Sequence, residues 1–435
     1  MDPIIVGLLG SVVLIILLFI GLPIAFVTMF VGFSGIVYLT SMEAGLTAVA
    51  KTVYEYSSNY PFTIIPLFIL MGSFAGQAGI TQELYQTFDK WFRKLPGGLG
   101  ITTVAACACF GAISGSSVAA AAAMGRIAVP EMRRFNYAPK LATGIVAAGG
   151  TLSFLIPPSL GFVFYGMLTE QSIGKLLISG IFPGIVLSLG FIIIILVQVK
   201  INPSLAPRTP GEVSWKEKVL ALSGVWETLL VFLMVMGGIF LGFITPNEAG
   251  AIGATALFII VLLKRRLTLN SFFASLSEAV RISCMIILLA AGATVFSYFL
   301  ALSTIPASVS TWMAELHVSR YLVLAVICFI YLILGCFLDS LSMMVLTLPV
   351  IFPIITTLGF DPIYFGVVCV IMMEAGLITP PVGLNVYTIA GIAKDVPMEE
   401  IFRGAIPFLL AMIGVTVLIT IFPKIALFLP ELMLK

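Results

Sequence analysis

One uncharged segment with basic residues on both sides restricts the fold more than any other part of the chain. Residues 101–125 carry no charge, yet the middle of this stretch is the polar sequence Ser114-Gly115-Ser116-Ser117. The basic residues on its flanks are Lys90, Arg93 and Lys94 before it and Arg133, Arg134 and Lys140 after it. Basic residues gather on the cytoplasmic side of membrane proteins. Both ends of the segment are therefore expected on the same side of a membrane.

A single crossing cannot leave both ends of a segment on one side. Two half-length helices that meet at a polar tip can, because an arm of about 16 residues reaches roughly 24 Å at 1.5 Å per residue. Non-helical backbone at that depth is tolerated only where protein buries it or water reaches it. We therefore predict a re-entrant hairpin over residues 98–132, with its tip at a binding site.

Composition agrees with a membrane location and excludes several other classes. The chain of 435 residues is 60% hydrophobic and 10% charged, with a mean hydropathy of +1.17, which predicts a polytopic all-α protein in a lipid bilayer. A net charge of +2 gives no sign of a nucleic acid partner. With one histidine and no HExxH motif, we expect no enzyme. The first apolar run lacks a basic n-region, so we expect a retained span and not a signal peptide.

Hydropathy divides the chain into continuous and interrupted apolar segments. The continuous ones lie at 4–20, 23–40, 60–78, 140–167, 176–199, 222–243, 247–263, 279–302 and 404–428. The interrupted ones are the hairpin at 98–132, a second hairpin at 321–357 and a broken span at 362–392, and the span at 140–167 is also broken, by a double proline. Residues 201–221 read as a polar linker that ends in a short surface helix over 213–222.

The two halves of the chain repeat each other. Pro23 has a counterpart in Pro246, and the prolines at 157–158 match those at 380–381. The tip at 111–117 matches 335–342, and Gly180 and Pro183 match Gly404 and Pro407. The offset stays between about 221 and 224, so we assign residues 1–200 to a first repeat and 222–435 to a second.

The basic residues predict opposite orientations for the two repeats. If the first hairpin opens to the cytoplasm, 16 of the 22 basic residues fall on the cytoplasmic side, 5 on the other side and Arg126 within the membrane. This topology places both termini outside. Inverted repeats with interrupted helices at matching positions indicate a secondary transporter.

Four polar clusters converge if the repeats pack about a pseudo-two-fold axis: the two hairpin tips and the two helix breaks. A double proline removes two backbone donors and frees carbonyl groups one turn back. Hydroxyl and freed carbonyl oxygens are ligands of the kind that hold Na⁺, and half-helix N-termini attract an anion. Small residues in membrane helices also serve close packing, but their duplication at equivalent positions favours a binding role.

Four charged residues are open to more than one interpretation. Asp339 lies in the middle of an apolar hairpin, where a carboxylate is costly and usually functional, although a structural pair or a helix cap is the alternative. Glu374 either orients backbone or binds. Arg126 could snorkel, pair with an acidic group or meet a substrate carboxylate. Glu248 follows Thr245 and is expected to cap the helix that it begins.

At these residues the chain resembles a known family. The hairpin tip Gly-Ala-Ile-Ser-Gly-Ser-Ser, the break Ile-Pro-Pro-Ser, the segment Thr-Pro-Asn-Glu-Ala-Gly at 245–250 and Thr-Pro-Pro-Val-Gly-Leu-Asn at 379–385 are similar to the large membrane subunit of TRAP (tripartite ATP-independent periplasmic) transporters. The resemblance implies an elevator-type, Na⁺-coupled symporter of organic acid anions in the bacterial inner membrane. It also implies two partners, a small four-span membrane subunit, here expected as a separate chain, and a periplasmic substrate-binding protein.

The resemblance places sodium at the tips and the facing breaks, and the substrate between them. For sodium in the first repeat we expect Ser114, Gly115, Ser116, Ser117, Gly150, Thr151, Ser153 and Pro157. For sodium in the second repeat we expect Gly335, Asp339, Ser340, Thr379, Pro380 and Gly383. For the substrate we expect Ser116, Ser159, Asp339, Ser342, Asn385 and Arg126. The alternative function is a stand-alone Na⁺- or H⁺-coupled carboxylate transporter or exchanger of the same plan.

Overall fold

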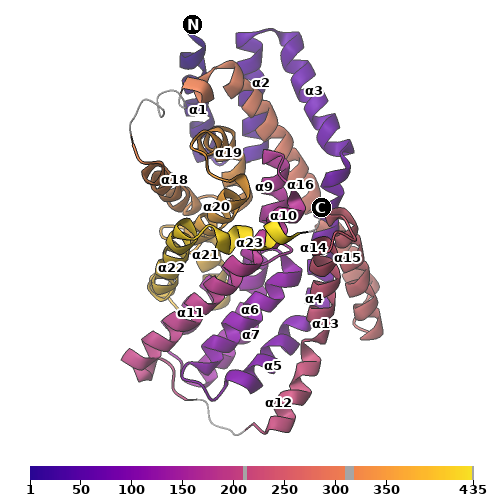
Figure 1. The fold of residues 1–435 in the computed structure, drawn as a ribbon, viewed down its shortest axis with the longest axis vertical. Helices are drawn as coiled ribbons and strands as arrows, with labels where there is room; N and C mark the ends of the chain where they lie inside the picture. The colour runs from indigo at the N-terminus through magenta and orange to yellow at the C-terminus, as the bar shows by residue number, and fades with distance from the viewer. Residues whose placement is uncertain (209–212, 309–317, 434–435) are drawn as a thin grey trace.

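A computed structural model describes residues 1–208, 213–308 and 318–433, and every regular element within these ranges is helical, which confirms the all-α expectation (Figure 1). Among these residues, six helices are long and apolar enough to cross a membrane, or up to eight if each of two bent helix pairs counts as one span. One bent pair, Pro139–Leu155 with Leu160–Thr169, turns by 45° at the predicted double-proline break.

Eleven α-helices lie within residues 1–201, and another eleven lie within the described residues after 213. Those of the first repeat are α1 (Pro3–Phe19), α2 (Ile24–Leu39), α3 (Met42–Ser58), α4 (Ile64–Gln77), α5 (Ile80–Phe92), α6 (Gly98–Ser114), α7 (Ser117–Arg134), α8 (Pro139–Leu155), α9 (Leu160–Thr169), α10 (Ile173–Ser179) and α11 (Ile181–Ile201). Those that follow are α12 (Trp215–Ala221), α13 (Trp226–Phe232), α14 (Gly238–Phe240), α15 (Pro246–Leu263), α16 (Leu269–Leu302), α18 (Arg320–Gly335), α19 (Ser340–Thr357), α20 (Pro362–Gly376), α21 (Leu384–Ile392), α22 (Met398–Ile421) and α23 (Lys424–Leu432).

Two apolar segments have different bounds from those that hydropathy predicts. The span expected at 279–302 is the C-terminal part of α16, a 34-residue helix that begins at Leu269. Its polar first turns are stabilised by a capping box at Thr268, which hydropathy does not register. The run at 404–428 is two helices, α22 and α23, because Pro423 has no N–H to continue the first.

Two helices begin at capping boxes that the sequence shows. In α15 the hydroxyl of Thr245 accepts from the Glu248 N–H, while the Glu248 carboxylate lies 2.7 Å from the Thr245 nitrogen. The expectation that Glu248 caps its own helix is confirmed. In α12 the same arrangement joins Ser214 and Glu217, at the start of the surface helix expected near 213–222.

The helices form an outer frame and an inner group. In the frame, α16 packs along α2 and α4, and a separate apolar cluster that includes Val31, Phe296 and Phe299 joins α1, α2 and α16. The inner group surrounds α8 and α20, in which every residue from Leu141 to Leu155 and from Ile363 to Gly376 is buried. A helix that is apolar on all sides is expected at the centre of a bundle. Each central helix carries one of the two predicted breaks at its C-terminal end.

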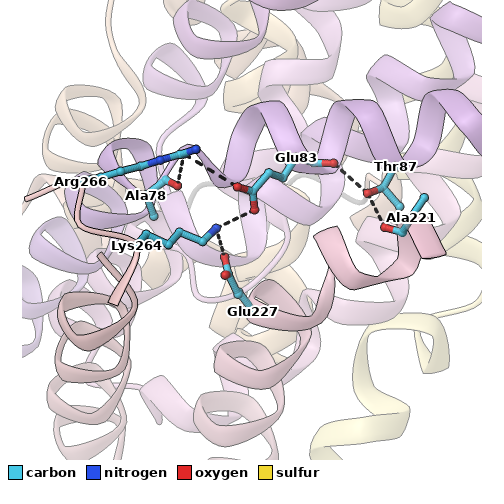
Figure 2. Close-up of polar contacts among 7 residues, drawn as sticks. All are labelled: Ala78, Glu83, Thr87, Ala221, Glu227, Lys264 and Arg266. Atoms are coloured by element: carbon cyan, nitrogen blue, oxygen red, sulfur yellow. Dashed lines mark hydrogen bonds and ion pairs between the residues drawn. The ribbon is translucent and has the colours of Figure 1, made fainter. Parts of the chain in front are cut away.

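A charged cluster joins α5 to the frame at the end of the molecule where α5 and α12 lie (Figures 1 and 2). The Lys264 Nζ lies 2.6 Å from Glu83 Oε2 and 2.7 Å from Glu227 Oε2. Arg266 donates to the Ala78 carbonyl at 2.6 Å. These contacts link the start of α5 to α13 and to the C-terminal end of α15. Helix α5 leads directly into the first hairpin, so the cluster fixes the frame side of that connection.

Candidate functional site

Each hairpin turns in a short segment between its two helices, at residues 115–116 in the first hairpin and 336–339 in the second. In the first hairpin α6 ends at Ser114, and Gly115 adopts a left-handed conformation with φ of +64°. Ser116 is the N-cap of α7, where its Oγ accepts from the Ala119 N–H at 3.4 Å. A methyl group on Gly115 would also lie 3.0 Å from the Pro158 carbonyl oxygen, so the first tip touches the first break.

Asp339 occupies in the second hairpin the position that Ser116 holds in the first. It is the N-cap of α19, and its carboxylate accepts from the Ser342 N–H at 3.2 Å and from the Ser342 hydroxyl. The helix-cap interpretation of this carboxylate therefore describes its protein contacts. Since Ser116 also caps its helix through a side-chain oxygen, the second arms of the two hairpins begin with the same kind of cap but differ in charge.

Each break redirects the carbonyl groups that its prolines leave without donors. In the first break the Ser159 hydroxyl donates to the Phe154 carbonyl. In the second, the Asn385 N–H donates to the Leu377 carbonyl at 3.1 Å. Ser159 and Gly383 are the N-caps of the helices that follow, α9 and α21. Both breaks thus combine carbonyl groups outside the regular helix bonding with the N-terminus of a half-helix.

Tip and break meet at backbone distance in each repeat. A methyl group added to Gly111 would lie 2.6 Å from the Ser153 Cα, and one added to Gly335 would lie 2.7 Å from the Gly376 Cα. Such approaches are possible only between very small residues. The structure therefore brings each predicted tip against its predicted break, at matching places in the two repeats.

The two tips are joined to each other by Glu374, near the C-terminal end of α20. Its Oε1 lies 3.3 Å from the Ser117 hydroxyl of the first hairpin and 2.9 Å from the Ser340 hydroxyl of the second. The residue is 1% exposed, and its Oε2 has no hydrogen-bond partner among the described residues. Burial of a carboxylate with one oxygen that lacks a hydrogen-bond partner costs free energy unless a ligand or a cation compensates the charge. Sequence analysis left this residue between two roles and outside the expected ligand set.

A cavity of about 530 Å³ separates the tips from the frame helices α4 and α16. Of the expected site residues, those that line it are Ser114, Gly115, Ser116, Ser117, Asp339 and Ser340. The opposite wall is polar as well: Ser73 lies 2.9 Å from both Ser275 and Glu278, and Gln77 donates to the Ser271 carbonyl at 3.1 Å. The cavity therefore has the tips on one side and a polar stripe of the frame on the other.

The remaining expected residues do not line the cavity; most of them are buried, but Pro380 is exposed. Thr151 donates to the Ala148 carbonyl at 2.6 Å, and Ser153 donates to the Cys107 carbonyl at 3.2 Å. Asn385 donates to the Ala147 carbonyl at 3.3 Å and so joins α21 to α8. Arg126 is exposed on α7 and does not line the cavity.

Sequence reasoning missed the frame side of the cavity. Ser73 and Gln77 are four residues apart in α4, and Ser275 and Glu278 are three apart in α16, so each pair lies on one helix face. A search for polar residues at helical spacing inside apolar spans would have found both stripes. Only the tertiary structure shows that the stripes face the hairpin tips.

The oxygen donors gathered at the tips fit a hard alkali cation. These oxygen atoms belong to the Ser117 and Ser340 hydroxyls, to the carbonyl groups at the breaks and to the Glu374 carboxylate, whose Oε2 has no hydrogen-bond partner among the described residues. Within the described ranges no three His, Cys, Asp or Glu side chains gather as they would around a transition metal. Uncharged oxygen ligands at helix breaks are the arrangement by which transporters hold Na⁺.

A family model described as tripartite ATP-independent periplasmic transporter, DctM component, matches residues 11–425. The chain is 34% identical over 385 residues to the C4-dicarboxylate TRAP transporter large permease protein DctM of Pseudomonas aeruginosa, covering 88% of this chain and 89% of that protein. It is 30% identical over 419 residues to the sialic acid TRAP transporter large permease protein SiaM of Vibrio cholerae, covering 96% and 97%.

Two further similarities extend the comparison. The isethionate TRAP transporter permease protein DctMQ of Oleidesulfovibrio alaskensis is 33% identical over 418 residues, which cover 94% of this chain and 64% of that protein. Among solved structures, the YdaH transporter of Alcanivorax borkumensis matches with a TM-score of 0.65 at 12% identity, over 98% of each chain. At that identity the likeness concerns the fold alone.

Proposed function

Since this chain belongs to the DctM component family of tripartite ATP-independent periplasmic transporters and is a large permease component, we propose that it couples Na⁺ entry to uptake of an organic acid anion. The observation that carries the proposal is the meeting of both hairpin tips with both helix breaks around Glu374, at the edge of a cavity. The cavity would hold the anion, and the tip–break contacts would hold Na⁺.

The geometry suits recognition of an anion. Helices α7 and α19 begin at Ser117 and Ser340, which line the same cavity, so the N-termini of two 18-residue helices lie at its wall. The partial positive charge at such termini favours a carboxylate or a sulfonate. The curated relatives are named for C4-dicarboxylate, isethionate and sialic acid, and we propose a substrate of this general class.

The residues around each tip explain how ion binding would precede anion binding. Bound Na⁺ would offset the negative ends of the carbonyl dipoles at the breaks and so hold the tips in place. Ser116 and Asp339 fix the first turns of α7 and α19 through their caps. With both first turns fixed, the N–H groups at the cavity wall are ordered before the anion enters. The loaded hairpins and broken helices would then move past α4 and α16.

Partners and location are proposed from the family. We propose a location in the bacterial inner membrane with both termini periplasmic, a separate small four-span subunit and a periplasmic binding protein that delivers the substrate. Reconstitution into liposomes tests this: a Na⁺ gradient should drive uptake only when all three components are present. Na⁺-driven uptake by this chain alone would favour the stand-alone transporter, and uptake that ignores Na⁺ would overturn the coupling.

A further inference from the structure

The structure assigns to Glu374 a role that rests on the proposed function: we infer that this one carboxylate orients the hydroxyls of both hairpin tips and thereby links the two ion sites. Ser117 and Ser340 come from different hairpins in opposite repeats, and both lie within hydrogen-bond distance of the same oxygen, Oε1. Among the described residues, no other side chain is hydrogen-bonded to both tips.

The chemistry of a hydroxyl explains the orienting effect. A serine hydroxyl carries one proton and two lone pairs, and by itself it can either donate or accept. A carboxylate oxygen only accepts, so each serine must direct its proton toward Glu374. The lone pairs of Ser117 and Ser340 are then turned away from Glu374, as acceptors for a cation. Glu374 is thus a positioning residue: it orients two hydroxyls that could otherwise donate or accept, so that both present lone pairs to a cation.

The carboxylate has no equivalent in the first repeat, although the sites it serves are duplicated. The offset of 223 that relates Ser117 to Ser340 and Pro157 to Pro380 relates Thr151 to Glu374. Thr151 is fully buried and carries no charge, and its hydroxyl bonds within its own helix, to the Ala148 carbonyl at 2.6 Å, and not to a tip serine. The Glu374 side chain therefore contacts both tips, and an ion that orders this side chain at one tip also orders it at the other tip.

Linkage between the sites follows from this sharing. Ordering a side chain and two hydroxyls costs conformational freedom, and the first ion to bind removes most of that freedom. The second ion then meets a site that is already ordered, which gives positive cooperativity in Na⁺ binding. Without the carboxylate each hydroxyl is free to turn, so both sites weaken and become independent.

The test uses the purified full chain and measures its melting temperature as Na⁺ replaces K⁺ at constant ionic strength. The wild-type chain should be stabilised by Na⁺ with a Hill slope above one. Glu374→Gln keeps the size of the side chain but removes its negative charge and replaces one of its two accepting oxygens with an NH2 group that donates. It should weaken the Na⁺ response by on the order of tenfold or more, as expected for lost hydrogen bonds to a charged group, and lower the slope to about one.

Matched variants separate this role from a general loss of structure. Glu248→Gln changes a carboxylate in the capping box of α15, away from the tips, and should leave the Na⁺ response unchanged. Ser117→Ala, Ser340→Ala and the double variant form a mutant cycle that needs no change at Glu374. If the sites are linked, the two single effects on Na⁺ response are not additive, and this holds even if Glu374→Gln fails to fold.

The outcomes distinguish the inference from the proposed function. A wild-type chain that shows no stabilisation specific to Na⁺ overturns the Na⁺ coupling itself, and the role of Glu374 falls with it. A wild-type chain that responds to Na⁺, together with an unchanged slope in Glu374→Gln and additive serine effects, overturns only the inference. Loss of slope in Glu374→Gln with non-additive serine effects supports it.

Discussion

At the scale of single residues, the two tips differ at one chemically decisive position. Ser116 and Asp339 are both N-caps of the second hairpin arm, and both accept from a backbone N–H three residues on. Serine and aspartate are about equally good caps, so capping does not explain why one of them is charged. Ser116 and Asp339 both line the cavity, so we infer that the charge of Asp339 acts on what binds there.

Two substitutions at Asp339 separate the cap from the charge. Asp339→Ser keeps a capping oxygen and should abolish uptake with little change in melting temperature. Asp339→Ala should abolish uptake and also cost about 1 kcal/mol of stability through loss of the cap. Uptake assays in liposomes and thermal melting measure the two effects. Wild-type uptake by Asp339→Ser would show that the carboxylate acts only as a cap.

Gly115 is constrained both by its backbone and by its surroundings. At φ of +64°, and with the Pro158 carbonyl 3.0 Å from the position of a Cβ, Gly115→Ala should destabilise the chain by about 1–2 kcal/mol. Gly414→Ala is the control, because a methyl group there meets nothing within 4 Å and the residue lies inside α22. Thermal melting compares the two. Equal melting temperatures would mean that the tip tolerates a side chain.

Residue-level prediction from the sequence succeeded where a pattern was duplicated and failed where a contact joins the repeats. The serines of both tips and the double prolines stand at a fixed offset, so their pairing could be read directly. The residue at the position of Glu374 in the first repeat is Thr151, so duplication did not point to Glu374 as a site residue. Its partners, Ser117 and Ser340, lie 257 and 34 residues away in the chain, and only tertiary packing brings them together.

At the scale of helices, α5 is held to the frame by ionic contacts that are largely withdrawn from water. The Glu227 side chain is 5% exposed, and Lys264, at 20%, is shared between Glu227 and Glu83. Removal of one member of such a cluster leaves the others close together without their counter-charge. The start of α5 is therefore tied to α13 and to the end of α15.

Lys264→Met should lower the stability of the chain by about 1–3 kcal/mol, less than for a fully buried pair because the cluster is partly exposed. Replacing all three residues, as Lys264→Met with Glu83→Gln and Glu227→Gln, should recover much of that loss. Lys51→Met is the control, since Lys51 and Glu55 form an exposed pair of little expected value. A triple variant no more stable than Lys264→Met would contradict the ionic explanation.

Helix positions were predicted well in the apolar middle of each element and less well at the ends. The hairpins and both broken spans lie at the expected residues because glycine, serine and proline interrupt them visibly. The start of α16 was missed because hydropathy records the apolar part of a helix and not its polar extension. The π-helical turn over Leu233–Gly237, within the span expected at 222–243, has no signal in hydropathy.

At the scale of the whole molecule, a cavity lies between two groups of helices. The tips and breaks form one wall, and α4 and α16 form the other. Along α16 the 34 residues extend roughly 51 Å, which exceeds the hydrocarbon thickness of about 30 Å. A single helix of the frame is thus longer than the bilayer core is thick, and its residues 278–286 include the ones that line the cavity.

If the hairpins move along α4 and α16 during transport, as we propose, a cross-link between the two walls of the cavity should stop uptake. Val118 in α7 and Ile282 in α16 line the same cavity from opposite sides. Cysteines placed at these two positions, in a chain whose six native cysteines are replaced, should react together with a short bifunctional thiol reagent. Uptake should be lost on cross-linking with a cleavable reagent and return on reduction. Full uptake by the cross-linked chain would exclude relative movement of the two walls.

The single carboxylate between duplicated tips also means that the two halves of this chain are no longer interchangeable. A chain assembled from two first halves would have Thr151 twice and no carboxylate to accept from the tip serines. A chain assembled from two second halves would bring two copies of Glu374 to one buried point, where their mutual repulsion would hold the tips apart. The fold keeps the symmetry of its repeat, while its centre has room for only one copy of the group that both halves require.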